Sequence, residues 1–384
     1  MSNLITKPKD NTLKRDFNLD LIRIIAFLFV PGVHFFLHGG FYSNTVSTDR
    51  MSIMLFFRTL FLLCIPLFLL LTGYLQADKK IEPNRKYFFK IGKFLIPYLI
   101  IMVFDLIVIE EILTPTIPSA FPQYQTKQYI QNFTSFTHYS WYVEMYIGLF
   151  LLIPFLNMIW QNLKTKNQEL FLIISLIAIT ILPSVFNVYD FYSANWMSAE
   201  STSNWKLFPS WWTKLYPITY YFVGAFLARH KQKFKMNPFI ALGIFLLSWG
   251  GVGHYVLERG KDLKPTIYAY SDYNSLGIFI MGVTLFIFVN SIRFRKVPLF
   301  VRKGVGKLSD LTFGAYLGSW ALDQIFYTAY LSKHTPVFED RWTYFPFAML
   351  VVVPTAFVIS YFTDMLYRTG CELFSKNKKK PSKE

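Results

Sequence analysis

The chain has 384 residues, of which 53% are hydrophobic, 19% aromatic and only 16% charged, and this composition excludes an ordinary soluble domain. A formal net charge of +16 would suggest a nucleic-acid ligand in a soluble protein, but membrane proteins gather Lys and Arg in the loops of one side, so no nucleic-acid partner is expected. The two cysteines, Cys64 in an apolar run and Cys371 in a basic tail, exclude a disulfide framework.

Apolar runs of about twenty residues follow one another along the chain, and each is long enough to cross a bilayer as a helix. Ten are expected, at about residues 19–37, 53–77, 87–109, 142–160, 169–187, 212–229, 238–257, 274–292, 309–332 and 344–367. The sequence therefore predicts an all-α, polytopic membrane protein. Its single transmembrane domain, residues 19–367, lies between an N-terminal segment, residues 1–18, and a basic tail, residues 368–384.

The basic residues predict how these helices are oriented. With the N-terminus in the cytoplasm, 28 of the 39 Lys and Arg residues fall in cytoplasmic segments, nine in external loops, and two, Arg23 and Arg58, inside spans. This bias alternates loop by loop, as the positive-inside rule requires. Both termini are therefore expected in the cytoplasm, where the basic tail would meet anionic lipid.

The first predicted span contains two chargeable side chains, Arg23 and His34. Such groups are expensive inside a membrane and are usually retained for a function. Eleven helical steps of about 100° bring them to nearly the same face, roughly 16 Å apart along the axis. Arg23 is therefore expected near one membrane surface and His34 near mid-depth, in a helix that Pro31 and Gly32 are expected to kink.

Each of these side chains has two interpretations. His34 is either a general base that takes a proton from an alcohol or a structural histidine bonded to a neighbouring helix. Arg23 either binds a phosphate bidentately or pairs with Asp20, three residues earlier on the same face. His38 is expected in a solvated outer loop, and Arg58 is expected to pair with an acidic neighbour.

The densest basic segment next to a span contains Arg85, Lys86, Lys90 and Lys93. Attraction to lipid headgroups is the simpler explanation of such a segment. Binding of a polyphosphate cofactor is the alternative, because Lys86, Lys90 and Lys93 share one helical face.

Polar residues also accompany aromatic ones near the expected outer ends of spans, and Glu144 and Asp323 are the functional candidates among them. Trp141 belongs to an external group with Trp196, Trp205, Trp211, Trp212 and Trp342. This group is either an interfacial aromatic belt or a platform on which sugar rings stack. No soluble catalytic signature and no metal-spaced set of Cys and His residues occurs, so no metal is expected.

Five segments in the same order resemble acyltransferase family 3, the integral-membrane acyltransferases. They are the R-x10-H signature at Arg23 and His34; FLLLTGYL at 68–75, with Thr72 where Ser is usual; the basic RKYFFKIGKFLIPY at 85–98, with lysines at several arginine positions; the helix from Ser140 through Trp141 to Pro154; and LTFGAYLGSW at 311–320, with Ser319 where many members have His. The resemblance covers about residues 15 to 367.

The resemblance implies an enzyme of the bacterial plasma membrane that moves an acyl group, usually acetyl, from cytoplasmic acyl-CoA to a hydroxyl of a cell-envelope polysaccharide or lipid-linked glycan. It implies that His34 is catalytic and that Arg23 and the segment from Arg85 to Lys93 contact the CoA. Some members carry an extra extracytoplasmic hydrolase-like domain, which is not found here, so a separate acyl-transfer partner outside the membrane is one expectation. The alternatives are a transporter or flippase of a lipid-linked glycan and a non-catalytic assembly protein.

Overall fold

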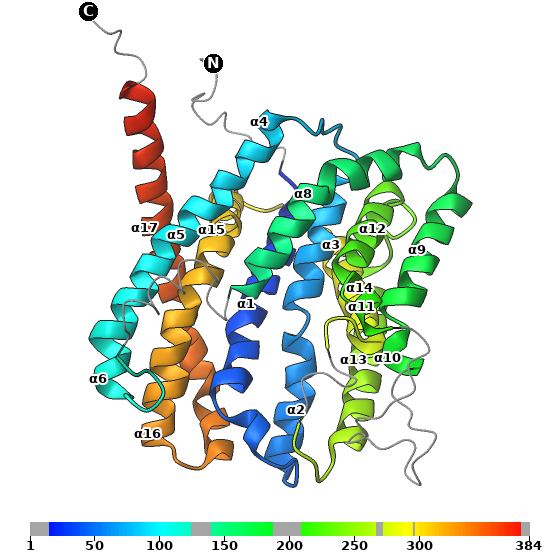
Figure 1. Ribbon diagram of the computed structural model, residues 1–384. Coiled ribbons are helices and arrows are strands. Elements are labelled where there is room, and N and C mark those ends of the chain that lie inside the picture. The colour runs from blue at the N-terminus through cyan, green and yellow to red at the C-terminus, as the bar shows by residue number, and fades with distance from the viewer. Residues whose placement is uncertain (1–14, 124–139, 187–208, 266–271, 295, 378–384) are drawn as a thin grey trace, which may run out of the picture.

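The computed structural model of the protein describes residues 15–123, 140–186, 209–265, 272–294 and 296–377. These residues form no β-strand, and the predicted all-α class is confirmed (Figure 1). The helices are α1 (Phe17–His38), η2 (Phe41–Ser43), α2 (Asp49–Phe61), α3 (Cys64–Gln76), α4 (Arg85–Phe88), η3 (Phe89–Ile91), α5 (Gly92–Val108), η4 (Ile109–Leu113), α6 (Thr114–Thr116), α8 (Trp141–Asn162), α9 (Lys166–Thr180), α10 (Pro183–Phe186), α11 (Ser210–Thr213), α12 (Tyr216–Arg229), α13 (Pro238–Gly260), α14 (Leu276–Ser291), α15 (Leu299–Asp323), η5 (Gln324–Leu331), α16 (Ser332–His334), η6 (Phe338–Asp340) and α17 (Arg341–Asn377).

Within these ranges, seven helical stretches are long and apolar enough to cross a membrane: Phe17–Ser43, Asp49–Gln76, Arg85–Thr116, Trp141–Asn162, Lys166–Phe186, Pro238–Gly260 and Phe338–Leu373. The other three expected spans coincide with α12, α14 and α15, of which α14 is a shorter apolar helix. The number of helices that cross the membrane, and the side on which the termini lie, stay predictions. In Figure 1, α4, the start of α1 and the end of α17 lie at one end of the bundle, and α6 and α16 lie at the other.

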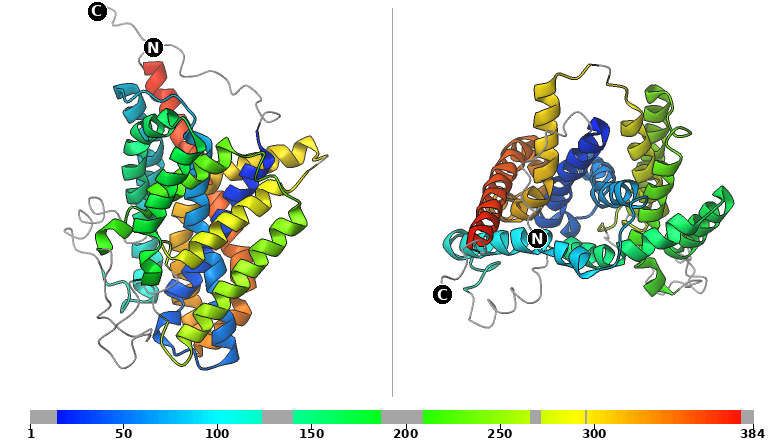
Figure 2. Two further views of the ribbon diagram at one scale, coloured as in Figure 1. Left: turned by 90° about the vertical axis from the view of Figure 1, so that its right-hand side faces the viewer. Right: turned by 90° about the horizontal axis from the view of Figure 1, so that it is seen from above.

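Helix α1 lies in the middle of the bundle, between α3 on one side and the pair α15 and α17 on the other (Figure 2). Its N-cap is Asp16, whose side chain accepts a hydrogen bond from the backbone N–H of Asn18, as N-cap residues do. Pro31 lies inside α1, and the helix continues through it to His38. Both chargeable side chains of this segment are therefore carried by one continuous helix.

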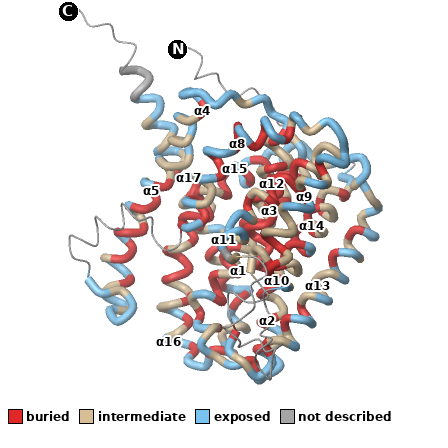
Figure 3. Tube along the Cα trace, turned by 45° about the vertical axis from the view of Figure 1, so that its right-hand side comes forward, coloured by how far each residue is buried: buried red, intermediate tan, exposed pale blue. Residues whose placement is uncertain are grey.

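Helices α3 and α12 cross so closely that their backbones are in contact. A Cβ atom built on Gly73 would lie 1.9 Å from the carbonyl oxygen of Tyr221, and one on Gly224 would lie 2.1 Å from that of Leu70. Small residues at such crossings let two membrane helices approach closely. Buried residues are frequent along these central helices, whereas the two ends of the bundle are mostly exposed (Figure 3).

Helix α15 changes its geometry at the end that carries Asp323. It passes directly into the π-helix η5, which is eight residues long. Widened turns of this kind are rare and occur frequently at functional sites. Asp323 is thus the last α-helical residue before the widened turns begin, and it faces α1.

Candidate active site

A histidine and an aspartate meet in the interior of the bundle. His34 Nδ1 lies 2.8 Å from Asp323 Oδ2, and the exposed fractions of the two residues are 9% and 0%. An aspartate bonded to Nδ1 fixes the tautomer of an imidazole and leaves Nε2 to exchange protons. The two interpretations of His34 are therefore compatible, because a histidine held by a neighbouring helix is also an oriented base.

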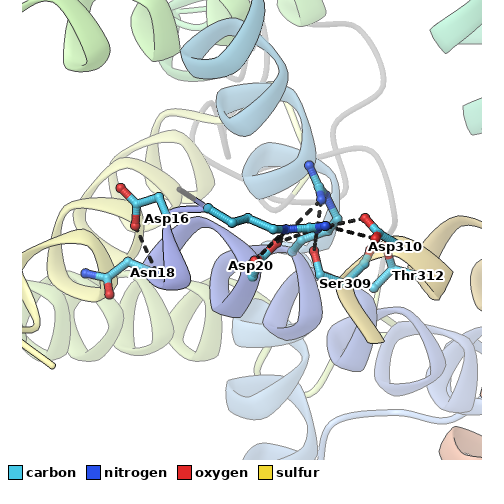
Figure 4. A network of polar contacts seen from close by, with 8 residues as sticks. Asp16, Asn18, Asp20, Ser309, Asp310 and Thr312 are labelled. Carbon is cyan, nitrogen blue, oxygen red and sulfur yellow. Dashed lines mark hydrogen bonds and ion pairs between the residues drawn. The ribbon is translucent and has the colours of Figure 1, made fainter. Parts of the chain in front are cut away.

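A second polar cluster joins α1 to α15 toward the end where α1 begins (Figure 4). The guanidinium of Arg15 bonds the carboxylates of Asp20 and Asp310, each at 2.7 Å. Hydrogen bonding to Asp310 raises the pKa of Arg15 above its ordinary value. Arg23 donates from Nη1 to Ser309 Oγ at 2.9 Å and lies 3.8 Å from Asp20. The expected pair of Arg23 with Asp20 is present, but Asp20 is closer to Arg15.

Arg23 lines a cavity of about 300 Å³, here called the inner cavity. Polar groups of Gln76, Thr72, Ser309, Asp310 and Thr312 lie along its wall with those of Arg23. Aromatic side chains form the remaining wall: Phe68, Phe94, Phe313, Tyr142, Tyr146 and Tyr316. Tyr142 and Tyr316 contact each other edge to face, with ring centroids 5.8 Å apart. The cavity thus combines a cation with an apolar interior.

The predicted basic segment lies beside this inner cavity. Arg85, Lys86, Lys90 and Lys93 are all exposed, and Lys90 lies over the ring of Tyr87 at 5.8 Å. The segment continues at once into α5, whose Phe94 lines the inner cavity and contacts Tyr146. None of the four cations is among the residues that line the inner cavity, but Lys93 directly precedes Phe94, which does.

A second cavity has a volume of about 450 Å³ and is here called the outer cavity. Val33 and Leu37, on the turn of α1 that carries His34, line it together with Trp141, Met145 and Tyr273, whereas His34 itself is not among its lining residues. Trp141 stacks on Tyr273, with ring centroids 5.5 Å apart. Adjacent residues of α8 therefore face different cavities, because Trp141 lines the outer one and Tyr142 the inner one.

The structure places the other candidate residues separately. Glu144 lies in the first turn of α8, as expected near the end of that span, but it is exposed and is not among the residues that line either cavity. Asp323 lies at the end of α15, bonded to His34. Trp196 and Trp205 fall outside the described residues.

The prediction that His38 is a solvated loop residue is wrong: it ends α1 and its Nδ1 lies 3.0 Å from Gln324 Nε2. Arg58 is fully buried and donates from Nε to the hydroxyl of Tyr42 at 2.7 Å. It also has an acidic neighbour, Asp272, whose carboxyl is influenced by the charge of Arg58.

A family model described as an acyltransferase domain matches residues 16–361. The chain belongs to acyltransferase family 3. The match includes α1 with Arg23 and His34, both cavities, and α15 with Asp323. No curated protein and no solved structure matches the chain. This member of acyltransferase family 3 is therefore a multi-pass membrane acyltransferase.

The sequence did not predict that Asp323 is the partner of His34 in this family member, and it indicated Asp323 only as a polar residue near aromatic ones. Asp323 lies 14 residues after Ser309 on α15, so the two lie on nearly the same helical face at about 100° per residue. This periodicity indicates a polar face on α15 but does not indicate which helix packs against it.

Proposed function

We propose that the protein is an O-acetyltransferase that takes an acetyl group from acetyl-CoA on the cytoplasmic side and gives it to a hydroxyl of an envelope glycan on the other side of a bacterial plasma membrane. One observation carries this proposal: the buried pair of His34 and Asp323 joins α1 to α15, in a turn of α1 whose neighbouring residues Val33 and Leu37 line the outer cavity. An oriented base in the wall of a binding cavity suits removal of a proton from a bound acceptor. The family membership supports the transfer chemistry.

In the proposed reaction, His34 Nε2 takes the proton of the acceptor hydroxyl while that oxygen attacks the carbonyl carbon of the thioester. A carbon–oxygen bond forms and the carbon–sulfur bond breaks. His34 then returns its proton to the leaving thiolate, so charge and atoms balance. Asp323 stabilises the imidazolium while the proton resides on it, because an opposite charge 2.8 Å away in a buried place is weakly screened. An acyl group carried briefly by His34 is a variant of this route.

The inner cavity suits the donor. Arg23 and the exposed cations at Arg85, Lys86, Lys90 and Lys93 would hold phosphates. The aromatic wall that ends at Tyr142 and Tyr316 would hold the apolar arm that bears the thioester. Trp141 on the other side would contact the acceptor, for which a saccharide ring is the expected shape.

The test is release of free CoA thiol by purified protein in lipid nanodiscs, given acetyl-CoA with and without glycan fragments from the envelope. Wild-type protein is expected to release thiol only with an acceptor, and the acceptor is expected to gain an acetyl mass. The variant His34→Ala should fold and release none. Full acetyl transfer by His34→Ala would contradict the proposal, and movement of lipid-linked glycan without thiol release would favour a transporter.

A further inference from the structure

The outer cavity contains a charged group that the proposed acyl transfer does not use. Arg58, on α2, lines this cavity with only 1% of its surface exposed. Its guanidinium also lies over the ring of Tyr42, with the central carbon 5.3 Å from the ring centroid. Its Nε donates to the hydroxyl of Tyr42, and its charge partly opposes the rise that burial causes in the pKa of the Asp272 carboxyl in the same lining. Ionisable groups inside membrane proteins are usually retained for a function, such as a ligand or ion pathway.

The lining of the outer cavity is positively charged on balance. Lys214, which is exposed, joins Arg58 there, and Asp272 is the acidic residue among the described residues of the lining. Burial raises the pKa of the Asp272 carboxyl above its ordinary value. A raised pKa means that this carboxylate takes up its proton at a higher pH than usual, so the lining becomes more positive as the pH falls.

The cavity also offers a flat apolar surface next to the cation. Trp141 and Tyr273 stack on each other in its wall, and aromatic faces of this kind pack against the apolar faces of sugar rings. Val33 and Leu37, which lie one residue before and three residues after His34 on α1, also line this cavity. A ligand held here would therefore contact the turn of α1 that carries the proposed base.

We propose that the outer cavity selects an acidic saccharide as the acyl acceptor, with a carboxylate or phosphate of the ligand bound by Arg58 and Lys214 and its ring beside Trp141. This inference deepens the proposed function and rests on it. Arg58 presents a planar set of donors that matches either anion in two parallel hydrogen bonds. Lys214 adds a point charge, and Asp272 opposes the anion and so limits its affinity.

The first experiment measures binding without an acyl donor, so that it does not depend on turnover. Full-length protein in nanodiscs is titrated with a glucuronate-containing disaccharide, with the same disaccharide after reduction of its carboxyl group, and with glucose 1-phosphate. Wild-type protein should bind the glucuronate disaccharide or the sugar phosphate about 10- to 100-fold more tightly than the reduced form, a range typical of one charged contact. The tighter of the two acids identifies the anion.

Three variants then assign the preference to the cavity. Arg58→Gln should remove most of the preference and leave binding of the reduced disaccharide unchanged. Lys214→Gln should reduce the preference for the acidic ligand several-fold. Because Lys214 is exposed, this variant keeps the test available even if Arg58→Gln fails to fold. Asp272→Asn should increase affinity for the acid. The matched control is Arg50→Gln, eight residues earlier on the same helix, where Arg50 pairs with Asp340 at the outer surface.

Equal binding of the acidic and reduced disaccharides, or no binding of any of the three ligands, would overturn the inference. So would a preference that survives both Arg58→Gln and Lys214→Gln. Failure of the proposed function looks different, because then the acid would bind selectively while acetyl-CoA releases no thiol. Acetyl transfer with no preference between acidic and reduced acceptors would leave the acetyltransferase intact and refute the acidic specificity.

Discussion

At the scale of single residues, the proposed chemistry depends on how one carboxylate holds one imidazole. The Oδ2 atom of Asp323 makes the hydrogen bond with His34. Its Oδ1 atom is buried without a hydrogen-bond partner in the described part of the chain. An ionised carboxylate accepts hydrogen bonds only, so when Asp323 is ionised His34 presents Nδ1–H to it and Nε2 carries the lone pair. The neutral tautomer required of a general base is thereby selected.

Asp323→Asn is expected to lower the acyl-transfer kcat by about 10²- to 10⁴-fold, because the amide can donate to Nδ1 and favour the wrong tautomer. The KM for acyl-CoA should change little, since Asp323 is not among the residues that line the inner cavity. Steady-state kinetics of thiol release measure both. The matched control is Asp364→Asn on α17, where the carboxylate pairs with Arg368. An unchanged kcat in Asp323→Asn would remove the carboxylate from the mechanism.

The sequence predicted part of this arrangement. The shared face of Arg23 and His34 followed from helical periodicity, and both side chains do meet α15, at Ser309 and Asp323. Asp323 was not predictable as the partner of His34, because 289 residues separate them and the packing of α1 on α15 is a tertiary property. The position of His38 was misjudged because the helix continues past Leu37.

At the scale of helices, the crossing of α3 and α12 limits what the core tolerates. Gly73→Ala should destabilise the protein by about 1–3 kcal/mol or more, because its Cβ would meet a backbone oxygen that cannot rotate away. Thermal unfolding in detergent measures the loss. Gly148→Ala is the control, since nothing lies within 4 Å of a Cβ there, and it should be neutral or stabilising by up to about 1 kcal/mol. Equal behaviour of the two variants would contradict the close crossing.

Element positions were largely predictable because each expected span is an apolar run, and every one coincides with a helix. Details inside these runs were predictable only in part. The run at 53–77 is divided into α2 and α3 at Leu62 and Leu63, and Pro66 shortly after them is a signal for this break, because it cannot donate a helical hydrogen bond to the carbonyl of Leu62. The π-helix after Asp323 contains no Pro or Gly and has no such signal. Packing between helices, which composition does not encode, sets this second irregularity.

At the scale of the whole molecule, Cys371 provides a test of the predicted orientation. It is a free, exposed cysteine near the end of α17, whereas Cys64 is buried. The bias of basic residues places Cys371 in the cytoplasm. A membrane-impermeant maleimide should therefore label the protein in inverted vesicles and leave it unlabelled in intact cells, and Cys371→Ser should abolish the signal. Labelling of intact cells would reverse the orientation.

The position of Tyr142 has a consequence for the permeability of the membrane. Its ring lines the inner cavity, packs against Tyr316, and follows directly after Trp141 of the outer cavity. Adjacent aromatic side chains of α8 therefore line two different cavities. Tyr142→Ala is expected to let protons leak through proteoliposomes, seen as faster decay of an imposed pH gradient, whereas Tyr344→Ala, at an exposed position, should not. A cell that lost this ring would thus forfeit part of its electrochemical gradient as well as an enzyme.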